Sequence, residues 1–212
     1  MGFAEELTEL LPEDLPQREY VVRMAAKHLD LITDANRHFN LTRITNPREA
    51  AIKHVVDSVL PWRLFAGARH VLDAGTGAGY PGIPLALILP SVRFTLSESV
   101  GKKARFVESV VKELDLRNVD VAGQRAEGII LTPRPDVLTA RAIAPIARAA
   151  ALFAPLLKRG TRALLFKGPD AQTEIDQAAA ELRKHSLRAL VIERYELPDG
   201  LGSRTIVDIL RS

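Results

Sequence analysis

The stretch of residues 70–79, HVLDAGTGAG, decides the fold class of this 212-residue chain. An apolar run passes Asp73 and enters a loop with glycine at every second position, Gly75, Gly77 and Gly79, and we expect a helix to begin near Ile83. Glycine permits positive φ and a close approach of the backbone to a ligand, and the start of a helix presents free amide groups. The stretch therefore predicts a strand, a ligand-binding loop and a helix.

Short β-like runs alternate with helical stretches on the C-terminal side of this loop. The strand-like runs lie at residues 71–72, 92–96, 119–121, 137–138 and 163–166. Such alternation predicts an α/β fold with a doubly wound, mostly parallel, Rossmann-like sheet and helices on both of its faces. Two further strand-like runs, at residues 189–195 and 205–210, flank a turn sequence at residues 198–200 and predict a closing β-hairpin.

Residues 3–65 have a different, helical pattern. Apolar residues between Val21 and Phe39 recur at helical spacing, and Asn46 followed by Pro47 and Glu49 is typical of a helix start. We therefore predict two parts, an N-terminal helical extension at residues 1–65 and a ligand-binding domain at residues 66–212.

Composition excludes several classes of site. The chain has no cysteine, which excludes a disulfide framework and a cysteine nucleophile, and its five histidines show no metal-ligand spacing, so that no metal is expected. The net charge of +3 permits a polyanionic partner without demanding one. There is no apolar run of about 18 residues or more, and the N-terminus lacks the pattern of a signal peptide. We expect a cytoplasmic monomer that does not bind membranes.

The glycine loop suits two ligand classes, dinucleotides and S-adenosylmethionine. Asp73, just before the glycines, would repel a pyrophosphate but suits the cationic ammonium and sulfonium groups of S-adenosylmethionine. Tyr80 stands where the third glycine of the dinucleotide motif would be. Glu98 follows the next strand, where it could accept hydrogen bonds from ribose hydroxyls of either ligand. The first two features favour S-adenosylmethionine, and residues 66–212 are thus predicted to form an S-adenosylmethionine-binding methyltransferase domain.

The position of Arg141 bears on the methylated atom. Amino-methylating enzymes commonly carry a Pro-Pro-aromatic loop after the fourth strand, whereas this chain has Arg141 there and no Pro-Pro pair. An arginine suits a target that is already nucleophilic and only needs to be held, such as guanine N7. A small-molecule amine would fit these residues too, so the target remains open at this point.

Several motifs together resemble a known family. They are Asn40-Leu-Thr42, His54-Val-Val-Asp57-Ser58, residues 73–84 (DAGTGAGYPGIP), residues 98–106 (ESVGKKARF), Arg125-Ala-Glu127, Arg141-Ala142, Lys167-Gly168 and Ser203-Arg204. This combination, which covers most of the chain, is similar to the bacterial small-subunit (16S) ribosomal RNA guanine-N7 methyltransferases, also called the glucose-inhibited division protein B family. The resemblance implies transfer of a methyl group from S-adenosylmethionine to N7 of a guanine in that RNA, with the RNA or the ribosomal subunit as partner.

The resemblance also implies roles for single residues. Cofactor binding would fall to Asp73, Gly75, Gly77, Gly79, Tyr80, Glu98, Ser99, Ala126, Glu127 and Arg141. Arg141 would be the catalytic residue, beside the methyl donor and the target base. The RNA would be met by Lys102, Lys103, Arg125, Lys167 and Arg204. The chain departs from the family where Glu98 replaces a frequent aspartate, Ala140 a serine and Pro169 a glutamine.

For many of these residues, a purely structural role is an alternative interpretation. His54 and Asp57 lie one helical turn apart and could simply stabilise one another. Lys102 and Lys103 could be the solvated face of a helix, and His28 is expected to be structural. As a whole protein, a small-molecule methyltransferase or a nucleotide-binding module such as a dehydrogenase remains an alternative. Steep salt dependence of binding would favour RNA, and failure to bind NAD would count against the second alternative.

Overall fold

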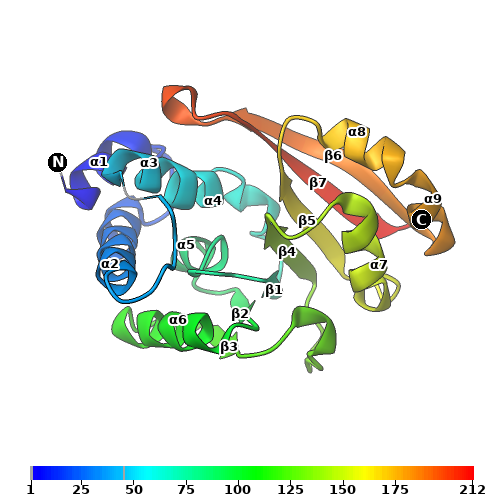
Figure 1. Ribbon diagram of the computed structural model, residues 1–212, viewed down its shortest axis with the longest axis horizontal. Helices are drawn as coiled ribbons and strands as arrows, with labels where there is room; N and C mark the ends of the chain where they lie inside the picture. The colour runs from blue at the N-terminus through cyan, green and yellow to red at the C-terminus, as the bar shows by residue number, and fades with distance from the viewer. Residues whose placement is uncertain (1, 45) are drawn as a thin grey trace.

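A seven-stranded sheet forms the centre of the protein in a computed structural model that describes residues 2–44 and 46–212 (Figure 1). The strand order is β3-β2-β1-β4-β5-β7-β6. The strands are β1 (His70–Ala74), β2 (Arg93–Ser97), β3 (Val119–Ala122), β4 (Val137–Arg141), β5 (Arg162–Lys167), β6 (Leu187–Glu196) and β7 (Ser203–Arg211). Strands β1 to β5 are parallel, and β7 is antiparallel to β5 and β6. The predicted doubly wound sheet and the closing hairpin are confirmed.

Helices cover both faces of this sheet. The helices are α1 (Phe3–Leu10), α2 (Arg18–Asn36), α3 (Pro47–Ala50), α4 (Asp57–Val59), α5 (Gly82–Ile88), α6 (Gly101–Glu113), α7 (Ile146–Leu157), α8 (Ala171–Gln177) and α9 (Ala179–Lys184). A π-helical segment, η1 (Ala51–Val56), joins α3 to α4, and short 3₁₀ turns lie at η2 (Trp62–Leu64), η3 (Ala126–Gly128) and η4 (Pro198–Gly200). Among the described residues, none of the helices combines the length and the hydropathy that crossing a membrane requires.

Two hydrophobic clusters follow from the alternation of side chains along the strands. Leu164 belongs to the cluster shared with helices α2, α5 and α6, whereas the adjacent Leu165 belongs to the cluster shared with α7 and α9. Both leucines are buried. Apolar side chains on both faces are what a central parallel strand requires, and this explains why the predicted strands are continuous apolar runs.

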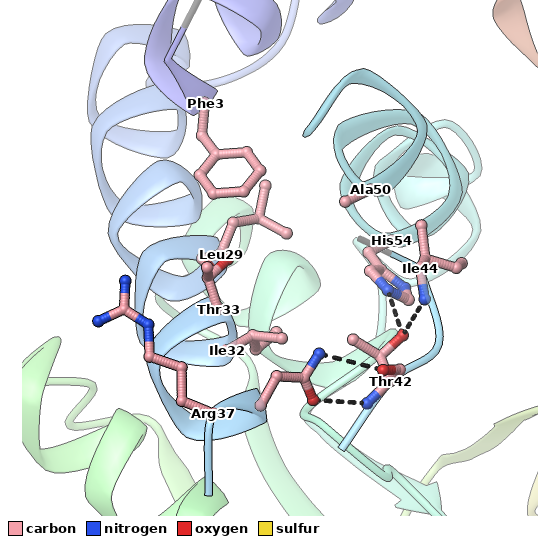
Figure 2. Close-up of a pocket in the computed structure, with 10 residues that line it drawn as sticks. Phe3, Leu29, Ile32, Thr33, Arg37, Thr42, Ile44, Ala50 and His54 are labelled. Carbon is pink, nitrogen blue, oxygen red and sulfur yellow. Dashed lines mark hydrogen bonds between the residues drawn. The ribbon is translucent and has the colours of Figure 1, made fainter. Parts of the chain in front are cut away.

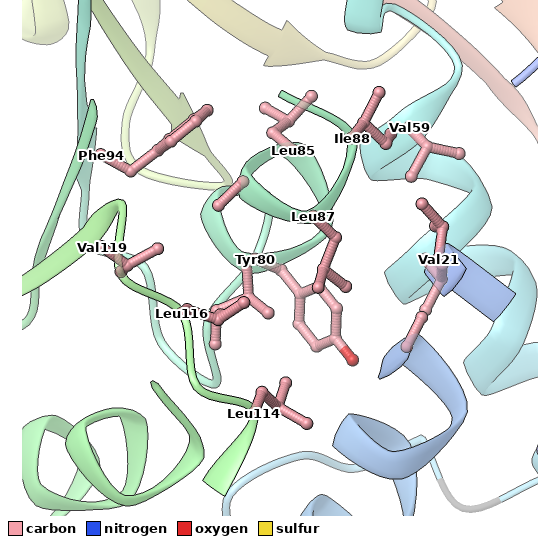
Figure 3. Packing of buried hydrophobic residues seen from close by; sticks show 14 of the residues in the cluster. Val21, Val59, Tyr80, Leu85, Leu87, Ile88, Phe94, Leu114, Leu116 and Val119 are labelled. Atoms are coloured by element: carbon pink, nitrogen blue, oxygen red, sulfur yellow. The ribbon is translucent and has the colours of Figure 1, made fainter. Parts of the chain in front are cut away.

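The N-terminal helices belong to the first of these clusters. Val21 of α2 and Val59 of α4 are buried with the sheet residue Phe94, and Figure 3 shows these side chains around α5. The boundary predicted at residue 65 falls between η2 and β1. Asn46 accepts a hydrogen bond from the backbone N–H of Glu49 at 2.9 Å, which confirms the predicted helix start.

Arg48 fastens this helical region to the tip of the hairpin. Its guanidinium contacts Glu6 at 2.8 Å, Glu9 at 2.9 Å and Asp199 at 2.5 Å. Glu6 and Glu9 come from α1, and Asp199 lies in η4 between β6 and β7. The N-terminal helical region and the tip of the hairpin, which are far apart in the sequence, are thus held together.

Candidate active site

The carboxyl ends of β1 and β4 define the candidate site. The strand order reverses between these two strands, because β2 and β3 lie beyond β1 whereas β5 lies beyond β4. In open α/β sheets, ligands bind in the crevice at such a reversal. Asp73 near the end of β1 and Arg141 at the end of β4 lie at this position.

The glycine loop is tied to the neighbouring strand through its backbone. The N–H groups of Gly75 and Thr76 both donate to the carbonyl oxygen of Ser97, at 2.9 and 3.0 Å. Gly75, Gly77 and Gly79 have φ values of +73°, +62° and +103°, which side chains disfavour. At Gly82 the constraint is close approach, since a Cβ there would lie 2.7 Å from a carboxylate oxygen of Asp73.

Asp73 is fully buried beneath this loop. Its Oδ2 accepts hydrogen bonds from the Thr76 hydroxyl at 2.6 Å and the Gly82 N–H at 2.9 Å. Its Oδ1 has no hydrogen-bond partner among the described residues. Burial raises the pKa of the Asp73 carboxyl to about 6, against the opposing effect of these two hydrogen bonds. A buried carboxylate with a free oxygen fits a cationic ligand group.

Glu98 bridges the loop to helix α6. Its Oε2 accepts from the Gly77 N–H at 3.1 Å, and its Oε1 accepts from the Val100 N–H at 2.8 Å. Each carboxylate oxygen has two lone-pair sites, so one site on each remains for a ligand hydroxyl. The carboxylate is thereby fixed in direction before any ribose arrives.

A cavity of about 230 Å³ lies beside the glycine loop. Its walls bring together the predicted cofactor residues Gly75, Ser99, Ala126 and Glu127. Ala126 is buried in η3 and adds an apolar surface to a lining that is otherwise partly polar. The mixed polar and apolar lining of this cavity suits a group such as adenine.

Tyr80 is the centre of a buried stack of three rings. The rings of His28 and His54 both lie 4.8 Å from the Tyr80 ring, at interplanar angles of 22° and 10°. Figure 3 shows the Tyr80 side chain among the buried apolar side chains of the core, next to Leu87. Its hydroxyl lacks a hydrogen-bond partner among the described residues. The Tyr80 side chain therefore packs in the core, and its backbone is what it offers to the loop.

His28 connects helix α2 to the loop. Its Nε2 lies 2.8 Å from the carbonyl oxygen of Ala78, and the side chain is fully buried. Burial lowers the pKa of His28 to about 4 and that of His54 to about 3. Both rings are thus neutral at physiological pH. The sequence predicted a structural role for His28, and the structure adds that it acts on the backbone of the glycine loop.

His54 and Asp57 do not stabilise one another as the simplest interpretation expected. The Nε2 atom of His54 lies 3.2 Å from the hydroxyl of Thr42, which in turn accepts from the Ile44 N–H (Figure 2). Asp57 points to the other side and binds different partners. The helical spacing of the two residues indicated a common face, but neighbours distant in sequence decide each contact.

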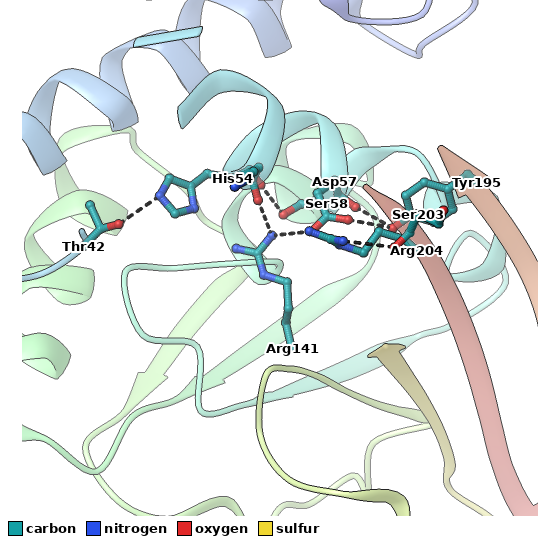
Figure 4. Close-up of polar contacts among 9 residues, drawn as sticks. Thr42, His54, Asp57, Ser58, Arg141, Tyr195, Ser203 and Arg204 are labelled. Atoms are coloured by element: carbon teal, nitrogen blue, oxygen red, sulfur yellow. Dashed lines mark hydrogen bonds and ion pairs between the residues drawn. The ribbon is translucent and has the colours of Figure 1, made fainter. Parts of the chain in front are cut away.

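Asp57 is the centre of a polar cluster shown in Figure 4. Its carboxylate is 2% exposed and accepts from Arg141 Nη1 at 3.2 Å, Arg204 Nε at 3.4 Å and the Tyr195 hydroxyl at 3.0 Å. Burial is the main cause that raises the pKa of Tyr195 far above its usual range, and the Asp57 carboxylate adds to it. The phenol therefore stays protonated and donates its hydrogen bond to Asp57. One carboxylate therefore orients two guanidinium groups and a phenol.

The guanidinium of Arg141 has a second anchor in the π-helical segment. Its Nη1 donates to the carbonyl oxygen of Lys53 at 2.8 Å. A π-helical turn interrupts the regular helical hydrogen bonds, and such turns are frequent at functional sites. The next residue, Ala142, has a φ of +53°, an uncommon value that turns the chain at the end of β4.

A second cavity, of about 370 Å³, opens beside this cluster. Its lining combines basic, acidic and apolar side chains: Ile44, Lys53, His54, Asp57, Arg141, Ala142, Phe166, Lys167, Gly168, Glu174 and Arg204. Lys167 is turned inward, with its Nζ 2.9 Å from Ala144 O and 2.7 Å from Glu174 Oε2. The structure thus places Arg141, Lys167 and Arg204 around one cavity.

The other residues predicted to meet RNA lie at the surface. Arg125 is exposed and lies 4.0 Å from Glu127. Lys102 lies over the Phe39 ring at 5.5 Å, and Lys103 lines a crevice of about 620 Å³ together with residues 40–43. These side chains lie apart from the cavity that holds Arg141, so the structure divides the predicted basic residues into an inner and an outer group.

Two residues of the site had no usable signal in the sequence. Tyr195 lies near the end of the alternating strand β6, 138 residues from its partner Asp57. Glu174 lies among several polar residues of α8. Neither residue belongs to a recognisable motif, and each becomes part of the site only through contacts with residues distant in the sequence.

The sequence of this chain is similar to those of known ribosomal RNA methyltransferases. The model of the family described as rRNA small subunit methyltransferase G matches residues 22–202. A ribosomal RNA small subunit methyltransferase G from Solibacter usitatus is 61% identical over 209 residues, which cover 99% of this chain and 100% of that protein. The protein of the same name from Carboxydothermus hydrogenoformans is 35% identical over 193 residues, covering 88% of this chain and 81% of the relative.

Solved structures of methyltransferases share the fold at low identity. Magnesium protoporphyrin IX methyltransferase from Synechocystis PCC 6803, with bound S-adenosylmethionine, aligns with a TM-score of 0.61 at 18% identity, over 87% of this chain and 97% of that one. A tRNA methyltransferase from B. subtilis aligns with a TM-score of 0.56 at 16% identity, over 74% and 64% of the two chains.

These comparisons and the sheet topology confirm the predicted family, the Rossmann-like fold, the enzyme class and S-adenosylmethionine as the cofactor. Since the family model spans most of the chain and the Solibacter relative matches almost all of it, the chain belongs to the rRNA small subunit methyltransferase G family.

Proposed function

We propose that this enzyme transfers a methyl group from S-adenosylmethionine to N7 of a guanine in small-subunit (16S) ribosomal RNA. The observation that carries the proposal is the position of Arg141. It lies at the end of β4, between the carboxylate-lined glycine loop and the cavity that also contains Lys167 and Arg204. Its guanidinium is fixed by Asp57 and by the Lys53 carbonyl, ready to hold a base beside the loop.

The residues of the loop fit the cofactor. The free Oδ1 of buried Asp73 suits a cationic group, and the positive φ values of the glycines bring the backbone close to a ligand. Glu98 would hold the ribose, and the cavity with Ser99, Ala126 and Glu127 would take the adenine. S-adenosylmethionine, when bound, supplies an activated methyl group.

The chemistry at guanine N7 needs no general base, because N7 has a lone pair and carries no proton. The protein then has to align N7 with the methyl group of the cofactor and keep the other atoms of the base away from that methyl group. Arg141 has five N–H donors, and those not used by Asp57 and Lys53 can donate to guanine O6, next to N7. Neutral His54 in the cavity wall adds no charge that would oppose a cationic product.

The outer group of basic residues supports RNA as the substrate. Lys102, Lys103 and Arg125 lie outside the reacting cavity, where they can contact phosphates. Contacts of this kind position a nucleic acid without reading its sequence. The small-molecule alternative gives these surface side chains no role. The expectations of a monomer and of a cytoplasmic location stay predictions.

The test is methyl transfer from labelled S-adenosylmethionine to small ribosomal subunits that lack N7-methylguanosine, with the modified position mapped. We expect incorporation at one guanine. Arg141→Ala should reduce turnover more than RNA binding, whereas the exposed Arg194→Ala serves as the matched control. Binding of S-adenosylmethionine without any incorporation would move the search to small-molecule acceptors. A loss of RNA affinity alone in Arg141→Ala would place this residue outside the reacting centre.

A further inference from the structure

Two acidic side chains, Asp57 and Glu174, line the cavity around Arg141. Both oxygens of Asp57 are in use, since Oδ1 accepts from Tyr195 and Oδ2 from the two arginines. Glu174 differs. Its Oε2 faces Lys167 Nζ at 2.7 Å and accepts from the Ile146 N–H at 3.2 Å, but its Oε1 accepts no hydrogen bond from any described residue. Among the carboxylate oxygens that the described residues bring to this cavity, Oε1 of Glu174 is thus the one that accepts no hydrogen bond from the protein.

Glu174 is held in place by the same contacts that leave Oε1 free. Its partner Lys167 is largely buried, with 13% of its side chain exposed, and is anchored a second time by the Ala144 carbonyl oxygen at 2.9 Å. The Ile146 N–H comes from the first residue of α7. A carboxylate fixed through one oxygen presents the other in a defined direction, which is what selective recognition requires.

Glu174 and Arg141 approach the cavity from different elements. Arg141 ends β4, whereas Glu174 belongs to α8, beyond the end of β5. In the sheet, β4 lies between β1, which leads into the glycine loop, and β5, which leads to α8. A cavity of about 370 Å³ lies within the range of about 300–1,000 Å³ that is usual for small-ligand sites. A base in this cavity would lie between Arg141 at the end of β4 and Glu174 of α8.

The edges of guanine match this arrangement. N7 and O6, both acceptors, lie on one edge. N1–H and the N2 amino group, both donors, lie on the edge that pairs with cytosine in a duplex. An ionised carboxylate only accepts hydrogen bonds, and a free oxygen offers two lone-pair sites. Adenine presents an acceptor at N1, which a carboxylate oxygen would repel.

We propose that Glu174 is the residue that selects guanine, with Oε1 accepting from N1–H and the N2 amino group while N7 faces the glycine loop. This inference rests on the proposed function, which supplies guanine as the target. It has a consequence for the RNA. The edge that Glu174 reads is the pairing edge, so the target guanine has to be unpaired when it enters the cavity.

The test crosses enzyme variants with a base analogue. Small subunits are reconstituted with guanine or inosine at the methylated position, because inosine keeps N7, O6 and N1–H but lacks the N2 amino group. We expect the wild-type enzyme to have a kcat/KM about 10-fold lower for inosine, the effect of one lost hydrogen bond to a charged group. In Glu174→Ala the rate with guanine should fall further than the rate with inosine, so that the ratio of the two approaches one.

Two further variants keep the result interpretable. Glu174→Gln preserves the size of the side chain and an oxygen for Ile146 N–H, and should lose the discrimination as well. Asp176→Asn changes an exposed carboxylate on the same helix and should keep the wild-type ratio. Calorimetric binding of S-adenosylmethionine and thermal unfolding check that each variant is folded.

Each outcome separates the two proposals. A wild-type enzyme that methylates guanine and inosine equally would overturn the role of Glu174. So would variants that lower both rates by the same factor, because Glu174 would then serve only to anchor Lys167 and α7. If the wild-type enzyme methylates no position of the subunit, the proposed function itself is wrong.

Discussion

The two sides of the active site are built in different ways. On the cofactor side, the Asp73 and Glu98 carboxylates bind backbone N–H groups and one hydroxyl, all from partners 2 to 21 residues away. On the side of the second cavity, Asp57 binds Arg141, Tyr195 and Arg204, which lie 84, 138 and 147 residues away. One side is a local backbone construction, and the other is a cluster of side chains from four segments.

This difference has energetic consequences. On the cofactor side, replacing Asp73 or Glu98 removes two hydrogen bonds, but the bonds from the Gly75 and Thr76 N–H groups to the Ser97 carbonyl oxygen remain. In the Asp57 cluster a single carboxylate orients three partners, so its removal leaves two guanidinium groups without their counter-charge. We therefore expect substitutions on the Asp57 side to have the larger effects.

Asp57→Ala should be the most damaging single change. Breaking a buried ion pair costs roughly 3–5 kcal/mol, and the partial exposure of Arg141 and Arg204 reduces this to about 2–4 kcal/mol. Turnover should fall by about 100-fold, because small displacements of a positioning group have that effect. Urea unfolding and methyl-transfer rates are the measurements. Asp57→Asn, which keeps an acceptor but not the charge, should lie in between. Unchanged turnover in Asp57→Ala would mean that Arg141 is positioned without Asp57, by the Lys53 carbonyl oxygen and the Tyr80 ring.

Asp73→Asn should separate stability from binding on the cofactor side. The pKa of Asp73 is raised to about 6 by burial, so below this pH the folded state binds a proton that the unfolded state does not yet bind. The stability of the ligand-free wild-type protein should therefore rise as the pH falls from 7 through 6 towards 4, relative to Asp73→Asn. At pH 7 the variant should be the more stable protein, by up to a few kcal/mol.

Binding should show the opposite pH dependence. The ionised carboxylate attracts the cationic cofactor, so affinity of the wild-type protein for S-adenosylmethionine should weaken as the pH falls below about 6. Arg141 and Glu98 are the other charged groups that act on Asp73. Calorimetry across this pH range is the measurement. An affinity that is independent of pH between 5 and 7 in both proteins would contradict the assigned role of Asp73.

Glu98→Ala should weaken cofactor binding by roughly 1–3 kcal/mol, because ribose hydroxyls lose their acceptor and the Gly77 N–H loses its anchor. Stability should change less than in Asp57→Ala, since both partners of Glu98 in the protein are backbone groups open to water replacement. Glu98→Asp keeps the negative charge but shortens the side chain, so it separates the effect of side-chain length from that of charge. Unchanged affinity in calorimetry for Glu98→Ala would count heavily against the ribose assignment.

Lys103→Gln should have the smallest effect and only on RNA. Loss of one phosphate contact should lower the slope of log affinity against log salt by about 0.7–0.9 and leave turnover of bound substrate unchanged. Lys158→Gln, an exposed lysine at the far end of α7, is the matched control. If both variants keep the wild-type slope, the crevice beside Lys103 lies outside the RNA path.

The sequence offered predictions for the cofactor side because the chemistry of that side is local. Asp73, the alternating glycines and Glu98 follow strands at fixed distances along the chain, and parallel strands bring their carboxyl ends to one edge of the sheet. The roles of the single residues stay predictions, but the structure brings Gly75, Ser99, Ala126 and Glu127 to one cavity. It also shows that the Tyr80 side chain lies in the core.

By itself, the sequence determined that a mostly parallel sheet forms, that strands and helices alternate along the chain, and that a glycine loop follows the first strand, because periodicity and turn chemistry act over a few residues. Only the tertiary structure decided that Arg141 is held by Asp57 and Lys53, that His28 grips the glycine loop, and that Glu174 presents a free oxygen. These contacts join segments far apart in the chain. Their partners are selected by the packing of whole elements, and no local pattern records that choice.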